Sequence, residues 1–132
     1  MARLKVKCNC GMTVEANVGD KLFDNKLYWF QSYHCCNCGR TIELDGIEKM
    51  PLEIEAAIIE QEGKYRLLLN DSKDRKKTEF LLKKNDNLGI FRQFVEKQSD
   101  EIAQGTKNEM LLIENFLKSK AGISCTIKHY LN

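Results

Sequence analysis

The residues best suited to chemistry in this chain are cysteines, which gather in two short stretches of its first third. One stretch reads CNCG at residues 8–11, and the other reads CCNCG at residues 35–39. In both, a glycine follows the last cysteine and allows a tight turn without a Cβ clash. Two such turns can direct four sulfurs at one point, and four thiolates form a closed, structural zinc site. We therefore expect zinc to be bound by Cys8, Cys10, Cys35 and Cys38.

Other uses of these thiols remain open. They could be buried and inert, or Cys35 and Cys38 could form a redox pair, although no thioredoxin-like βαβ pattern surrounds them. We expect Cys36 to be a bystander, but Cys36 or His34 could replace one of the four ligands. Cys125 lies on the apolar side of an alternating stretch, which predicts a core position.

Short strands are expected to position the sulfurs. Residues 3–8 and 12–18 alternate between apolar and polar side chains, which predicts a hairpin around the first cysteine pair. Residues 27–34 are aromatic and favour a strand, with residues 40–44 as its partner, whereas residues 19–26 read as a loop. So small a β unit has a poor core, and zinc could contribute on the order of 10 kcal/mol to its folding.

The stretch CNCG…CCNCGRTIEL resembles the zinc-ribbon class, in which two cysteine knuckles on β-hairpins share one zinc ion. The second knuckle has the usual two residues between its cysteines. The first has one. The resemblance covers residues 1–48 and implies a β zinc ribbon.

The rest of the chain predicts an α+β unit that follows a linking helix. Residues 45–51 read as a break, Pro51 suits the first position of a helix, and Gly63 suits its end. Thr106 and Glu109 form a capping-box pattern before the clearest helix. After the linking helix we expect a strand at 64–69, helices at 70–84, 88–97 and 107–121, a strand at 123–130, and residues 101–105 as the one candidate for a short middle strand. The predicted domains are a zinc ribbon (1–48), a linking helix (49–63) and an α+β domain (64–132).

The two halves of the chain differ in charge. Residues 1–62 contain 7 Lys or Arg and 10 Asp or Glu, whereas residues 63–132 contain 14 and 9. Within the basic half, Lys76 and Lys83 are seven positions apart, as are Lys77 and Lys84, so that each pair shares a helix face. This cationic stripe could bind phosphates or carboxylates, or it could simply be a solvated helix face.

Residues 64–128 resemble the C-terminal domain of the bacterial ribosomal stalk protein. The matching segments are KYRLLL, KKTEFLLKK, LGIFRQFVE and NEMLLIENFLKSKAGISCTIK. The resemblance implies an order of strand, two short helices, strand, helix and strand, and a ribosome or translation factor as partner. It also implies a partner-binding face formed by Lys76, Lys77, Lys83, Lys84 and Arg92.

Catalysis is not expected. The two histidines, His34 and His129, are far apart in the sequence, and the chain has neither a glycine-rich phosphate loop nor a nucleophile motif. We therefore expect no small-molecule substrate. The absence of a long apolar stretch predicts no membrane span, and the absence of a secretory signal predicts a cytoplasmic protein.

The function predicted first is a non-enzymatic zinc-binding protein that acts through macromolecular interaction, with translation as the candidate process. A first alternative is an RNA- or DNA-binding zinc-ribbon module, in which the aromatic run from Tyr28 to Tyr33 stacks on bases. A second alternative is an immunity-type protein that inhibits a toxin or an enzyme.

Overall fold

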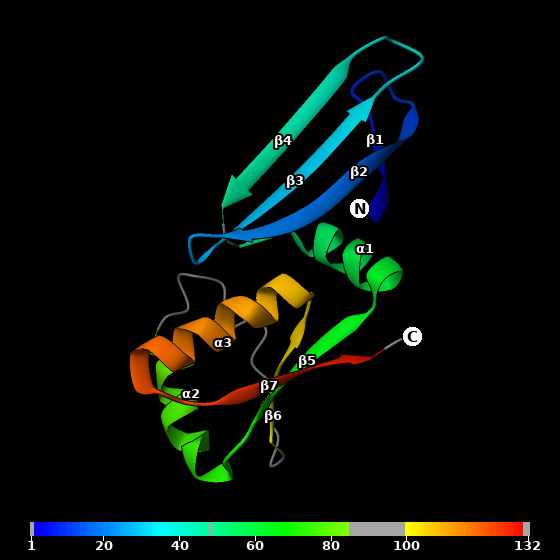
Figure 1. The fold of residues 1–132 in the computed structure, drawn as a ribbon. Helices are drawn as coiled ribbons and strands as arrows, with labels where there is room; N and C mark the ends of the chain where they lie inside the picture. The colour runs from blue at the N-terminus through cyan, green and yellow to red at the C-terminus, as the bar shows by residue number, and fades with distance from the viewer. Residues whose placement is uncertain (1, 48, 85–99, 131–132) are drawn as a thin grey trace.

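The computed structural model describes residues 2–47, 49–84 and 100–130. Within these residues the chain is an α+β protein with two antiparallel sheets and three α-helices (Figure 1). None of the described helices is both long enough and apolar enough to cross a membrane. In chain order the elements are β1 (Ala2–Lys7), β2 (Thr13–Phe23), β3 (Lys26–His34), β4 (Thr41–Ile47), α1 (Leu52–Glu62), β5 (Lys64–Leu69), a 3-10 turn (Ser72–Asp74), α2 (Arg75–Lys84), β6 (Glu101–Gly105), α3 (Lys107–Ala121) and β7 (Cys125–Tyr130).

The N-terminal sheet is a meander in the order β1-β2-β3-β4, in which each strand pairs with the next. Its two central strands are longer than predicted, because a two-residue turn joins them. Asp24 and Asn25 form this turn with φ angles of 53° and 58°. Two successive residues with positive φ are typical of a type I′ hairpin turn. The expected loop over residues 19–26 is therefore wrong, since β2 extends to Phe23 and β3 begins at Lys26.

β4 also continues beyond its predicted end, into the expected break at residues 45–51. Gly46 pairs with Trp29 across the β3–β4 ladder. A Cβ added at Gly46 would stand 2.5 Å from the nearest atom of the Trp29 indole ring. The glycine is thus required by a close side-chain approach within a strand, and does not mark the end of one.

α1 covers one face of the N-terminal sheet and follows Pro51, which is the N-cap residue and thus lies one position before the predicted one. The helix ends at Gly63, as predicted, where the Gly63 backbone N–H donates to the Ile59 carbonyl. Apolar side chains at helical spacing face the sheet and build a core with it. That core contains Ala2, Val18, Leu27, Met50, Ile54, Ala57, Ile58 and, from α3, Leu112.

The C-terminal sheet has the order β6-β5-β7, so the predicted middle strand at residues 101–105 is present at one edge. α3 begins with the predicted capping box. Thr106 Oγ1 accepts from the Glu109 backbone N–H at 3.1 Å, and Glu109 Oε1 accepts from the Thr106 N–H at 2.9 Å. The predicted helix at 88–97 lies outside the described residues. The C-terminal core contains Leu67, Leu69, Leu82, Ile102, Ala103, Met110, Ile113, Leu117 and Ile123.

Polar contacts tie the N-terminal sheet to the helices. The Asp20 carboxylate of β2 accepts from Thr106 Oγ1 at 2.6 Å and from Asn108 Nδ2 at 3.1 Å, both at the start of α3. At the open edge of β1, Gln61 of α1 accepts from the Arg3 backbone N–H at 3.1 Å and donates to the Arg3 carbonyl at 2.6 Å. The two hydrogen bonds of Gln61 occupy the Arg3 backbone groups, which would otherwise be free to pair with another strand.

We expect Asp20→Ala to weaken the packing of α3 on the N-terminal sheet, because Thr106 and Asn108 both lose their carboxylate partner. The expected loss is about 1–3 kcal/mol in the free energy of unfolding. Urea denaturation followed by circular dichroism measures it. Glu43→Ala, which also removes a carboxylate but at an exposed position of β4, is the control. Equal midpoints for the two variants would contradict the role assigned to Asp20.

Candidate metal centre

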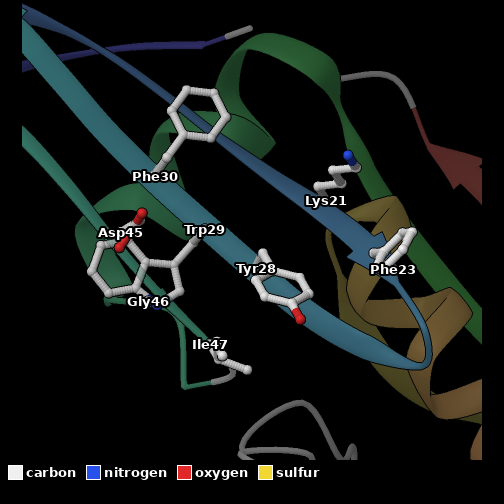
Figure 2. Close-up of a pocket in the computed structure, with 8 residues that line it drawn as sticks. All are labelled: Lys21, Phe23, Tyr28, Trp29, Phe30, Asp45, Gly46 and Ile47. Atoms are coloured by element: carbon white, nitrogen blue, oxygen red, sulfur yellow. The ribbon is translucent and has the colours of Figure 1, made fainter.

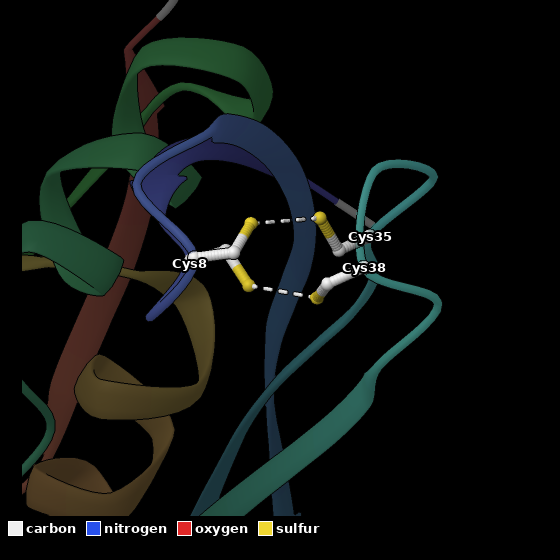
Figure 3. A group of neighbouring side chains, drawn as sticks. Cys8, Cys35 and Cys38 are labelled. Carbon is white, nitrogen blue, oxygen red and sulfur yellow. Dashed lines mark hydrogen bonds between the residues drawn. The ribbon is translucent and has the colours of Figure 1, made fainter.

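Four sulfurs from two separate turns lie together at one end of the N-terminal sheet, where Figure 3 shows Cys8 facing Cys35 and Cys38. Cys8 and Cys10 belong to the β1–β2 turn, and Cys35 and Cys38 belong to the β3–β4 turn. All four Sγ atoms lie within 4.8 Å of one another. The Cys8–Cys38 and Cys10–Cys35 Sγ distances are both 3.6 Å.

The spacing of the sulfurs fits a metal ion. Four thiolates at 2.3 Å from a central zinc ion, in tetrahedral geometry, are separated by about 3.8 Å. A disulfide needs sulfurs only about 2 Å apart, and all six cysteines of the chain are free thiols. The four cysteines predicted from the sequence are therefore brought together in an arrangement that could hold a metal ion.

The first turn is short and closed by its own backbone. The Cys8 N–H donates to the Met12 carbonyl at 2.8 Å, and the Gly11 N–H donates to the Cys8 carbonyl at 2.9 Å. Gly11 has a φ of 95°, a conformation that side chains with a Cβ rarely adopt. The turn therefore brings both of its sulfurs to one side within four residues.

The second turn repeats this construction with one more residue. The Cys35 N–H donates to the Arg40 carbonyl at 2.8 Å, and the Gly39 N–H donates to the Cys35 carbonyl, also at 2.8 Å. Gly39 has a φ of 76°. The different spacing of the two cysteine pairs is thus a difference in turn length, and it does not separate the sulfurs.

Backbone amides stabilise negative charge on several of the sulfurs. In three cases the N–H of the residue two positions further along the chain points at the sulfur. The pKa of Cys8 is lowered, chiefly by the backbone N–H of Cys10. The pKa of Cys10 is lowered to about 6 by the side-chain amide of Asn37, 3.5 Å from its Sγ, and by the backbone N–H of Met12. Such donors favour thiolate, which is the form that binds metals.

Crowding of the sulfurs acts in the opposite direction on Cys38. The backbone N–H of Arg40 favours its thiolate, but burial and the thiols of Cys8, Cys35 and Cys10 outweigh that effect and raise the pKa of Cys38 to about 11. Four negative sulfurs this close repel one another unless a cation lies between them. Metal binding at neutral pH must therefore release at least one proton.

Two further residues, which were not predicted from the sequence to have this role, hydrogen-bond to the sulfurs. Asn37, between the cysteines of the second turn, donates its amide to Cys10. Tyr33, near the end of β3, hydrogen-bonds to the Cys8 sulfur, and burial followed by this contact raises the pKa of the Tyr33 hydroxyl. Asparagine within a turn gives no sequence signal for such a contact, because it depends on the opposite turn coming close.

Two of the four cysteines are buried at this end of the sheet, and the other two, Cys10 and Cys38, are exposed. Cys8 is 3% exposed and Cys35 is fully buried, whereas Val6, Val14 and Ile42 nearby are only half-buried. The core under α1 lies toward the other end of the strands (Figure 1). A bound metal would therefore replace a hydrophobic interior where the helices do not reach.

The remaining thiols and the nearby histidine lie outside the cluster. Cys36 is exposed, and its sulfur is not part of the group of four. His34 Nδ1 forms a 2.9 Å hydrogen bond with Thr41 Oγ1 across the β3–β4 ladder. Cys125 packs against the C-terminal core, as predicted, and burial raises the pKa of its thiol to about 11.

The predicted cationic stripe is on α2, where its four lysines are exposed: Lys76, Lys77, Lys83 and Lys84. Arg92, the fifth predicted residue of this face, lies outside the described residues. Phe80, which sequence reasoning missed, is 65% exposed. It is three or four positions from each lysine and therefore sits among them on one helix face. Lys84 Nζ lies 5.9 Å from the centroid of the Phe80 ring.

No protein-family model, curated protein or solved structure matches this chain. Its function must therefore be inferred from the chemistry of its own residues.

Neighbouring cysteines provide a direct test of the cluster. Cys35→Ser replaces a buried member, so we expect any metal that the purified protein holds at this cluster to be lost. Cys36→Ser makes the same chemical change one position away, outside the cluster, and should leave the metal content unchanged. Elemental analysis of both variants after gel filtration measures metal per chain. Equal metal content in the two variants would contradict the assignment of these ligands.

Proposed function

We propose that this chain is a non-enzymatic zinc-binding protein that acts through macromolecular interaction, and that its zinc ion is structural. The observation that carries the proposal is the group of four Sγ atoms within 4.8 Å of one another. A tetrahedral set of four sulfurs selects zinc or iron among the common metals. Zinc is favoured because it has no redox chemistry and is the usual metal of paired cysteine turns.

The ligand set supports a structural role. Four protein thiolates fill a tetrahedral shell and leave no position for a substrate or for an activated water. The metal would instead hold the β1–β2 and β3–β4 turns together, as the resemblance to zinc ribbons implies. Because thiols persist in reducing compartments, we place the protein in the cytoplasm.

The metal assignment predicts about one zinc ion per chain by elemental analysis. Chelation should lower the stability of the N-terminal sheet, since metal binding contributes directly to folding. Cobalt substitution should give the intense visible absorption of a tetrahedral thiolate site. Because the thiols must lose protons to bind, zinc affinity should fall as the pH falls from neutral toward 5, as measured by competition with a chromogenic chelator. Protein that stays metal-free and keeps the same melting temperature with chelator or with added zinc would contradict the proposal.

We further propose that the exposed face of α2 binds a protein partner with an acidic surface. Phe80 provides an apolar centre, and the four surrounding lysines provide a charged rim. An apolar anchor enclosed by polar residues is the usual anatomy of a protein–protein hot spot. The resemblance to the ribosomal stalk domain makes ribosomes and translational GTPases the candidate partners. The order β5, α2, β6, α3 and β7 agrees with the order that the resemblance implies, except that its second short helix falls outside the described residues.

Purified ribosomes and purified translational GTPases are the probes for this surface. Binding measured by biolayer interferometry should weaken at least ten-fold in the double variant Lys77→Glu/Lys84→Glu, because rim charges steer and orient the partner. The exposed pair Lys118→Glu/Lys120→Glu on α3 is the control with the same change in net charge. No binding to either probe would remove translation as the process. Equal weakening by the two double variants would remove α2 as the surface.

A further inference from the structure

The N-terminal sheet has an outer face, which is the face turned away from α1. Strand alternation separates the two faces: Val18, Leu22 and Leu27 point to the helices and join or border the core. The residues between them point outward, and cross-strand pairs such as Lys21 with Tyr28 and Tyr28 with Ile47 lie side by side there. Figure 2 shows this region, where the sheet lies in front of the helices.

A hollow of about 570 Å³ lies against the outer face near the β2–β3 turn. It is lined by outward-facing side chains from three strands and by Trp29 and Gly46. The outward side chains are Lys21, Phe23, Tyr28, Phe30, Asp45 and Ile47.

Two apolar side chains of this hollow are open to solvent, and the rings of Tyr28 and Phe30 are half-buried. Phe23 is 62% exposed and Ile47 is 55% exposed. The Phe30 ring lies over Gly19, since a Cβ there would stand 2.6 Å from two ring carbons. The ring therefore lies against the backbone of the neighbouring strand and presents a flat surface. Contiguous exposed apolar side chains of this kind mark a site of interaction.

Cations flank the rings. Lys21 Nζ lies 5.7 Å from the centroid of the Phe23 ring, and Lys26 pairs with Phe23 across the β2–β3 ladder. Lys5 and Lys7 of β1 point to the same face, but they lie opposite Glu15 and Thr13, away from the β2–β3 turn. The acidic residues that point to this face include Glu15, which Arg3 engages at 2.8 Å, and Glu43 and Asp45 of β4.

We propose that the outer face binds single-stranded nucleic acid. Phe23, Tyr28 and Phe30 would stack on successive bases, and Lys21 and Lys26 would contact phosphates. Stacking platforms with adjacent cations are how proteins hold unpaired strands, because every base has a flat apolar face. The Asp45 carboxylate at the rim can accept from the exocyclic amino group of a base. A duplex hides its base faces and would not reach the rings.

This inference rests on one part of the proposed function, namely that the protein acts by binding another macromolecule. It uses a surface different from the α2 face and residues that are not metal ligands. The metal content of each sample is measured alongside binding. A sample that keeps its metal but binds no strand would overturn the inference and leave the zinc centre standing.

The experiment uses the full metal-loaded chain and a fluorescein-labelled single-stranded RNA of about twelve nucleotides. Fluorescence anisotropy is recorded at roughly 50 mM and 200 mM salt, with the matching duplex as competitor. Phe23→Ser and Lys26→Glu alter the outer face at exposed positions where misfolding is not expected. Leu52→Ser on α1 and Lys118→Glu on α3 likewise replace an exposed apolar side chain and an exposed lysine, and they serve as controls.

We expect Phe23→Ser to weaken binding by about five-fold or more, which corresponds to the loss of one base–ring stack. Lys26→Glu should also reduce the salt slope by about 0.7, the value for one phosphate contact with a single strand. Both controls should bind like the unaltered protein, and the duplex should compete poorly.

Three outcomes would overturn the inference. The first is no anisotropy change at micromolar protein and low salt. The second is equal weakening by the outer-face variants and the control variants, which would indicate a diffuse charge effect. The third is a dimer in sedimentation analysis that Phe23→Ser converts to monomer, since the outer face would then be covered by a second copy of the chain.

Discussion

The meeting of four sulfurs at the end of the N-terminal sheet is the constraint on which that half of the molecule depends. The two turns that supply them have equivalent backbone hydrogen bonds, and each keeps its glycine in a conformation closed to other residues. This costs conformational entropy, and neither core of the described residues includes the turns, which would offset it. A cation among the sulfurs can supply that free energy and also relieve the repulsion that raises the pKa of Cys38.

The opposite end of the same sheet is stabilised differently. There α1 and α3 cover it, Leu112 of α3 joins its core, and Asp20 binds the start of α3. The C-terminal sheet has a core of its own, with β5 at the centre. Removal of a metal held by the four sulfurs would therefore act mainly on the strand ends near the turns, while α3 and the C-terminal sheet keep their packing.

The sequence predicted correctly those features that depend on a few neighbouring residues or on a recognisable motif. The capping box of Thr106 and Glu109 and the end of α1 at Gly63 are present as predicted, and so is the convergence of the four cysteines. The failures at residues 19–26 and 45–47 have a different cause. Asp20 lies in a strand, where its carboxylate binds the start of α3. Gly46 also lies in a strand, where the Trp29 ring packs against it. These reasons involve partners distant in the chain or on another strand, which residue patterns do not reveal.

The two ends of the outer face differ in composition, and only one of them has the composition that a structural role alone would require. Near β1 this face carries charged and polar residues, with Arg3 and Glu15 paired, as expected for a sheet that faces water. Toward the β2–β3 turn the same face carries phenylalanine and tyrosine instead, although the core draws on the other side of these strands. An exposed aromatic patch on an antiparallel sheet raises the risk of aggregation and adds nothing to that core. Its presence at one end only agrees with the proposed binding of a ligand that has flat apolar faces. The adjacent lysines favour a ligand that is negatively charged.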